Sequence, residues 1–133
     1  MMKIRYSAVL VLLSFFPVIA QKPVSFIAEY IDFGITENFF TVNGMYLFVS
    51  RTSDPVHPVI LFPFSVPAVE VDSIGVVNLN EPGRIDFTKR KKDIVFSLTL
   101  NPYDTVCLQV YYRQPLAVTN TYILTSSRTW DRP

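Results

Sequence analysis

Two runs of alternating apolar and polar residues, 94–100 and 105–112, constrain the fold most strongly. The apolar positions are Ile94, Phe96, Leu98 and Leu100 in the first run, and Val106, Leu108, Val110 and Tyr112 in the second. Side chains of a strand change face at every residue, so each run predicts a strand with one apolar face. Asn-Pro-Tyr-Asp, a turn-forming sequence, separates them at 101–104. We expect two antiparallel strands that pair with each other and are covered by a second sheet.

The same pattern recurs in shorter segments along the chain. The further expected strands are 26–35, 39–49, 59–62, 73–79, 85–87 and 121–125. Turn residues recur every 8–12 positions, which is typical of sandwiches and barrels, and no segment keeps a helical period over three turns. The sequence therefore predicts an all-β, two-layer antiparallel immunoglobulin-like β-sandwich. A small closed barrel is the alternative, and the prolines and breaks favour the sandwich.

Two of these segments carry more specific predictions. In 26–35, Glu29 interrupts an expected inward row of Ile27, Ile31, Phe33 and Ile35, which indicates a strand that starts at a sheet edge or is paired late. Residues 59–62 form a continuous apolar run, Val-Ile-Leu-Phe, which predicts a strand covered on both faces.

Asn43-Gly44 allows two interpretations. Asn-Gly between alternating apolar residues favours a hairpin with a type I′ turn. One long strand with a glycine bulge is the other possibility. The hairpin arm that begins at Phe39 would be only three or four residues long, so we favour the long bulged strand.

The first twenty residues predict a secretory signal peptide. Lys3 and Arg5 precede an apolar core at 8–16, and small residues precede a cut at Gln21. The alternative is a membrane anchor, but the uncharged run spans 16 residues and a bilayer crossing needs about 20. We expect one domain at 21–133, and export to the periplasm, the cell envelope or the medium.

Charge and cysteine content exclude several classes. Loss of Lys3 and Arg5 lowers the basic residues from twelve to ten against eleven acidic ones, so the mature net charge is −1. A near-neutral domain gives no reason to expect nucleic acid as a partner. Cys107 is the only cysteine, so no internal disulfide can form, and we expect it to be a half-buried strand residue rather than a reactive thiol.

No constellation of side chains points to catalysis or to a cofactor. His57, the only histidine, lies between two prolines, and neighbouring Ser53 and Asp54 rarely reach triad geometry from the same loop. Glu70 and Asp72 offer two ligands, whereas calcium needs six to eight oxygens, so we expect solvated carboxylates there. We therefore predict a chain that is not an enzyme and needs no metal or cofactor.

One charge cluster stands out: Lys89, Arg90, Lys91 and Lys92 lie between two expected strands. Such a cluster can contact an anionic lipid, glycan or protein surface. It can equally prevent the neighbouring strands from pairing with other chains, and this second interpretation requires no ligand.

The aromatic residues suggest a second candidate surface. Most of them must fill the core, but consecutive Tyr111 and Tyr112 cannot share a face, so one of them points outward. Phe64, Tyr111 and Trp130 are the candidate interface aromatics, toward an apolar groove or a further domain.

Three segments together resemble the N-terminal β-sandwich of a group of uncharacterised exported bacterial proteins. They are the Tyr-x-Phe segment 42–48, the Phe-Pro-Phe segment 61–64, and the Tyr-rich 110–114 with 122–125 and Thr129-Trp130. The resemblance covers most of the mature chain and carries no catalytic residues. It implies that the chain continues beyond the tryptophan, and the sequence itself leaves open a truncated reading frame.

The combined prediction is an exported, non-catalytic module for protein interaction or envelope assembly. Its expected partner is another envelope protein or a further domain of the same protein. Two alternatives are kept: an accessory domain of a larger secreted enzyme, and a carbohydrate- or lipid-binding sandwich that uses exposed aromatic residues.

Overall fold

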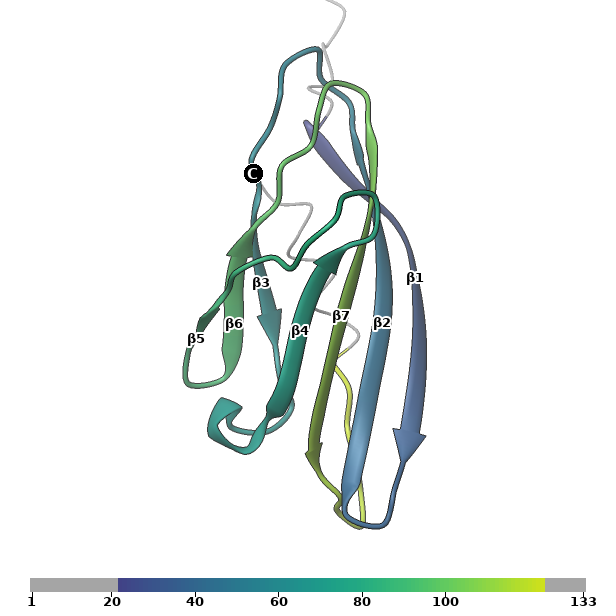
Figure 1. Ribbon diagram of the computed structural model, residues 1–133, viewed down its shortest axis with the longest axis vertical. Coiled ribbons are helices and arrows are strands. Elements are labelled where there is room, and N and C mark those ends of the chain that lie inside the picture. The colour runs from purple at the N-terminus through teal and green to yellow at the C-terminus, as the bar shows by residue number, and fades with distance from the viewer. Residues whose placement is uncertain (1–21, 124–133) are drawn as a thin grey trace, which may run out of the picture.

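The computed structural model describes residues 22–123 (Figure 1). The predicted signal peptide, Trp130 and the end of the last expected strand lie outside these residues. The strands are β1 (Val24–Ile35), β2 (Phe39–Ser50), β3 (Val59–Pro63), β4 (Asp72–Asn78), β5 (Thr88–Lys89), β6 (Asp93–Ser97) and β7 (Thr105–Pro115). A single 3-10 turn, η1 (Ala68–Glu70), precedes β4. This part of the chain contains no helix with the length and apolar character needed to span a membrane.

The strands form two packed antiparallel sheets. The larger sheet has the order β1-β2-β7-β4, and the smaller has the order β3-β6-β5. The prediction of an all-β, two-layer antiparallel architecture is confirmed. The larger sheet is also the longer one, since β1, β2 and β7 extend well past the ends of β3 and β6 (Figure 1).

The two alternating runs do not pair with each other, so that prediction is wrong. β6 pairs with β3 and β5, whereas β7 pairs with β2 and β4. Residues 98–104 carry the chain from one sheet to the other, and Leu98 N–H donates to the Pro58 carbonyl at 3.0 Å on the way. The two runs therefore lie in different sheets, and each covers the apolar face of the other. This arrangement excludes water from both apolar rows although the two strands do not form a hairpin.

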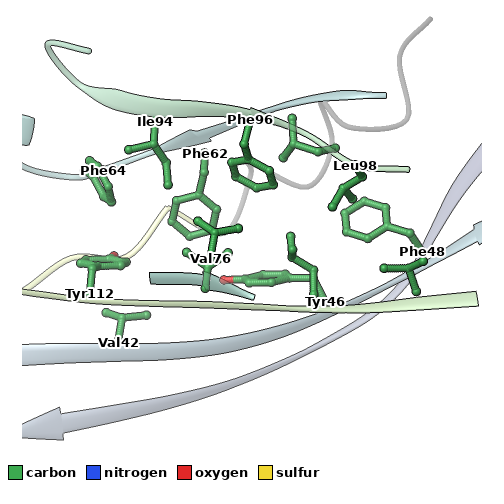
Figure 2. Close-up of a cluster of buried hydrophobic side chains, with 14 of the residues drawn as sticks. Val42, Tyr46, Phe48, Phe62, Phe64, Val76, Ile94, Phe96, Leu98 and Tyr112 are labelled. Atoms are coloured by element: carbon green, nitrogen blue, oxygen red, sulfur yellow. The ribbon is translucent and has the colours of Figure 1, made fainter. Parts of the chain in front are cut away.

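The core lies between these facing rows and is largely aromatic (Figure 2). Phe62 of β3 meets Tyr46 edge-on, with ring centroids 5.8 Å apart, and meets Tyr112 at 6.1 Å. Phe64 lies 4.9 Å from Tyr112. Edge-to-face contacts of this kind add to the stabilisation that burial of each ring already provides.

Asn43-Gly44 lies within unbroken strand β2. The long strand is confirmed over the hairpin, but the bulge is not at this position, because pairing with β1 and β7 keeps its register through both residues. Gly44 is needed for another reason. A Cβ here would collide with the ring and hydroxyl of buried Tyr46, two residues along the same face. The register shift lies in β1, between Phe26 and Ala28.

Three strand predictions need correction. Residues 85–87 are not in a strand, and the short strand of this region is β5 at Thr88–Lys89. β3 alternates between exposed and buried residues, with Val59 67% and Leu61 36% exposed, so it is covered on one face only. In the described chain the smaller sheet contains β3, β6 and β5, and β3 is one of its two outer strands. Residues 121–123 are not in a strand; the Ser65 hydroxyl donates to the Thr121 carbonyl at 2.5 Å and holds that segment beside the end of β3.

Candidate functional site

The residues considered for catalysis do not form a reactive cluster. His57 is exposed, and its Nδ1 lies 3.2 Å from the Thr99 hydroxyl, not beside Ser53 or Asp54. Cys107 is half-buried on β7 opposite Leu47, as expected for a strand residue. Within residues 22–123, no three His, Cys, Asp or Glu side chains gather into a group that could hold a metal ion.

The acidic pair proposed at 70 and 72 is split between two elements. Glu70 ends η1 and is exposed, whereas Asp72 begins β4 and forms an ion pair with Arg113 of β7. The hydrogen bond from the Arg113 guanidinium lowers the pKa of Asp72. This carboxylate is therefore occupied by a cross-strand contact and does not form a cation site with Glu70.

Of the four cations at 89–92, Lys89 ends β5 and the other three form the turn between β5 and β6. Two of the four already have partners. Lys89 Nζ donates to the Val71 carbonyl at 2.7 Å. Arg90 Nε lies 2.8 Å from Asp93 Oδ1. The ammonium groups of Lys91 and Lys92 have no hydrogen-bond or ion-pair partner among the described residues. Lys91 and Lys92 are therefore the residues of this cluster that remain available to bind a ligand.

The three candidate interface aromatics have different positions. Phe64 is only 4% exposed and packs on Phe62 and Tyr112, so it belongs to the core and not to an interface. Tyr111 does face outward, as one of the two consecutive tyrosines had to, and its ring covers Gly75 on the neighbouring strand. It lines a shallow hollow of about 300 Å³ on the outer face of the larger sheet. Trp130 lies outside the described residues.

A surface that the sequence analysis did not select runs along β1. Four large apolar side chains of this strand are at least half exposed: Ile27 (53%), Tyr30 (61%), Phe33 (52%) and Ile35 (72%). We call these four residues the apolar edge. β1 pairs with β2 on one side and is the last strand of its sheet on the other, within the described part of the chain.

The bulge in β1 decides which of these residues face the core side. Ile27 is the extra residue, so it leaves the expected inward row and is exposed. Beyond it, Phe33 and Ile35 lie opposite Val42 and Phe40, whose side chains are buried in the core. Phe33 and Ile35 thus point toward the core side, as predicted, but the shorter smaller sheet does not extend beneath them (Figure 1).

The inner face of β1 is only partly covered, by an aromatic cluster. Phe33 stacks on Phe40 with centroids 5.6 Å apart and meets Tyr122 edge-on at 5.6 Å. The Tyr122 hydroxyl is 2.7 Å from that of Tyr46, and burial together with this contact raises the pKa of Tyr46. The segment that contains Tyr122 therefore fills part of the space that a fourth strand of the smaller sheet would occupy.

Glu29 is the charged residue within this inner row. It lies opposite Tyr46, and burial of its carboxyl raises its pKa. One carboxyl oxygen, Oε2, is shielded from solvent and has no hydrogen-bond partner among the described residues. A buried carboxyl oxygen without a hydrogen bond destabilises the folded state.

Comparison of the chain with models of known protein families and with curated protein sequences finds no match. The geometry of the described residues is therefore the basis for the proposals below.

Proposed function

We propose that this chain is an exported, non-catalytic immunoglobulin-like interaction module whose strand β1 binds an extended segment of a protein partner. The observation that carries the proposal is the apolar edge: a twelve-residue outer strand with large apolar side chains exposed on both of its faces. An added strand would pair along the outer side of β1, which is the last strand of its sheet in the described chain, and would cover these side chains.

The area involved supports a specific contact. Full burial of one large apolar side chain contributes about 1.5–3 kcal/mol, and the four residues here are about half exposed. Part of that gain is offset by the ordering of the partner segment. A strand added at β1 would thus gain from both main-chain hydrogen bonds and apolar burial.

The charges of β1 indicate the chemistry of the partner. Its two charged residues, Glu29 and Asp32, are both acidic. Antiparallel pairing of two β1 strands about Glu29, close to the midpoint of the strand, would place the two Glu29 carboxylates opposite one another, and like charges in that position destabilise a sheet. A partner strand with lysine or arginine between apolar residues would instead pair with both. We therefore favour a different protein over a second copy of this chain.

The division of seven strands into sheets of four and three supports the immunoglobulin-like part of the proposal, since constant-type domains have the same division. The order along the chain differs. In those domains the last two strands belong to the smaller sheet, whereas here β7 lies in the larger sheet between β2 and β4.

The test is capture of partners from the cell envelope with the purified chain and with a Tyr30→Lys/Ile35→Lys variant. Lysine on an edge strand opposes strand addition. The matched control is Tyr103→Lys/Leu79→Lys, which changes one exposed tyrosine (69%) and one exposed aliphatic residue (49%) outside β1. We expect a partner that the control retains and the β1 variant loses, with slower amide exchange in β1 when the partner is bound.

Three results would contradict the proposal. They are equal capture by both variants, protection confined to other strands, or turnover of a substrate by the purified chain. A dimer that forms through β1 would replace the heterologous partner with a second copy.

A further inference from the structure

We infer that the side of the sandwich that carries β5 and η1 is a docking surface for anionic lipid bilayers (Figure 1). Six residues form this surface, which we call the basic tip: Pro67, Val69, Lys89, Arg90, Lys91 and Lys92. They line a shallow, open hollow of about 720 Å³. The inference is independent of the proposed function, because it concerns another part of the molecule and another class of ligand.

The apolar component of the basic tip is held outward by the fold. Val69 is 86% exposed, yet its neighbours Ala68 and Val71 are each 1% exposed and anchor the 3-10 turn in the core. Ala68 N–H donates to the Lys91 carbonyl at 2.8 Å, which fixes η1 to the lysine turn. An exposed valine on a rigid support is available to enter a membrane interface without a cost in loop ordering.

The cations surround this valine and are also fixed through their backbone. The Lys92 carbonyl accepts a hydrogen bond from Phe64 N–H at 2.8 Å, and Arg90 N–H donates to the Asp93 carbonyl at 2.8 Å across the turn. The free ammonium groups of Lys91 and Lys92 extend from this framework. Lysine stems can lie along apolar surface while their charges reach lipid headgroups.

The acidic groups nearby leave a net positive surface. Asp93 is paired with Arg90, and Asp72 is paired with Arg113, so Glu70 is the acidic residue of this region without a salt bridge in the described chain. Charge complementarity therefore indicates an anionic partner. A bilayer fits better than a soluble polyanion, because a polyanion would gain nothing from an exposed valine, whereas a bilayer interface accepts both components.

The position of the surface is compatible with a partner at β1. β5 and η1 lie on one side of the sandwich and β1 lies on the other (Figure 1). A molecule that rests on a bilayer through the basic tip would leave its apolar edge accessible.

The experiment measures co-sedimentation with vesicles of phosphatidylglycerol and phosphatidylcholine, and with vesicles of phosphatidylcholine alone. We compare the unmodified chain, Lys91→Ser/Lys92→Ser, Val69→Ser, and the control Lys22→Ser/Arg84→Ser, which removes two exposed cations elsewhere. Every variant carries the same N-terminus, checked by intact mass, so residues 1–20 contribute equally wherever they are retained.

We expect binding to the anionic vesicles that falls as salt is raised. Loss of Lys91 and Lys92 should weaken vesicle binding about 30-fold, because each lysine contributes separately to the attraction by the anionic surface. Val69→Ser should weaken it about threefold through lost apolar burial. The control Lys22→Ser/Arg84→Ser should weaken vesicle binding less than Lys91→Ser/Lys92→Ser does.

Other outcomes overturn the inference. If no variant binds vesicles, or if the control weakens binding as much as the double variant, the tip is not a lipid-docking surface. If Val69→Ser has no effect and heparin displaces the protein, the surface recognises a soluble polyanion. If Lys91→Ser/Lys92→Ser aggregates but binds vesicles normally, the lysines protect the edge of the smaller sheet instead.

Discussion

The two outer strands of the larger sheet, β1 and β4, differ in how far their outer edges are protected from pairing with another strand. β4 has seven residues and a register shift after Asp72, and Ser73 adopts a positive φ of 52° there. Its outer edge is also partly paired, because Ile85 N–H donates to the Val76 carbonyl at 2.8 Å. β1 has twelve residues, one bulge near its start and neither lysine, arginine nor proline.

The outer strand β5 of the smaller sheet resembles β4 in this respect. It has two residues, of which Lys89 is the first of four consecutive cations. Natural sheets protect their edges by short strands, bulges, charges and covering loops. β4 and β5 carry several of these features, whereas β1 is long and has only a bulge and two acidic residues. This contrast is why we propose β1 as the binding strand.

The largest effect expected from this contrast is in the core. Phe62→Ala should lower the free energy of unfolding by about 3–5 kcal/mol, because the ring is fully buried. Phe33→Ala should cost about 1 kcal/mol, because half of its ring is already in water. Urea denaturation measures both. Equal losses would show that the inner face of β1 is covered in solution, and the contrast between the edges would fail.

A smaller difference is expected between two glycines. Gly44→Ala should cost about 1–3 kcal/mol, because Tyr46 is buried and cannot move away from the new methyl group. Gly75→Ala meets the outward-facing Tyr111, whose ring can turn into solvent, so we expect a loss below about 1 kcal/mol. Thermal denaturation of the two variants tests this order. The reverse order would mean that the ring of Tyr111 is fixed more firmly than that of Tyr46.

Glu29→Gln should slightly stabilise the protein at neutral pH, by about 2 °C in Tm. Burial raises the pKa of Glu29 in the folded state, so ionisation of this carboxyl destabilises the folded state above that pKa. The destabilisation decreases as the pH falls through the folded-state pKa. The gain of the variant should therefore disappear in acid. A variant that is less stable at pH 7 would indicate that the carboxylate has a stabilising partner in solution.

Asp72→Asn on β4 should show the smallest effect, with the opposite sign. The pKa of Asp72 is lowered by Arg113, so its contribution is present above the unfolded-state pKa and is lost as pH falls through the folded-state value. The variant should be slightly less stable than the unmodified chain at pH 7 and equal to it in strong acid. Melting curves from pH 2 to pH 7 give both comparisons, and a constant difference across that range would contradict the assignment to Asp72 ionisation.

Two features of the candidate surfaces could be anticipated from local patterns, although the apolar edge itself was not selected. Glu29 within an apolar row indicated that 26–35 was an edge strand, and the cations at 89–92 were found as a cluster. Val69 was missed because a lone valine in an apolar segment gives no sign of exposure. Phe64 was misplaced because the sequence does not show which aromatic residues fill the core, and its contact with Tyr112 places it there.

The alternation of side chains determined by itself that the chain forms strands and that two layers must enclose their apolar faces, because a strand cannot place successive residues on the same side. Only the tertiary structure decided which strands are neighbours. Residues 94–100 and 105–112 could exclude water either side by side under a cover or face to face, and long-range pairing with β2 and β3 selected the second arrangement. The open face of β1 follows from that choice, because the smaller sheet ends before it reaches this strand.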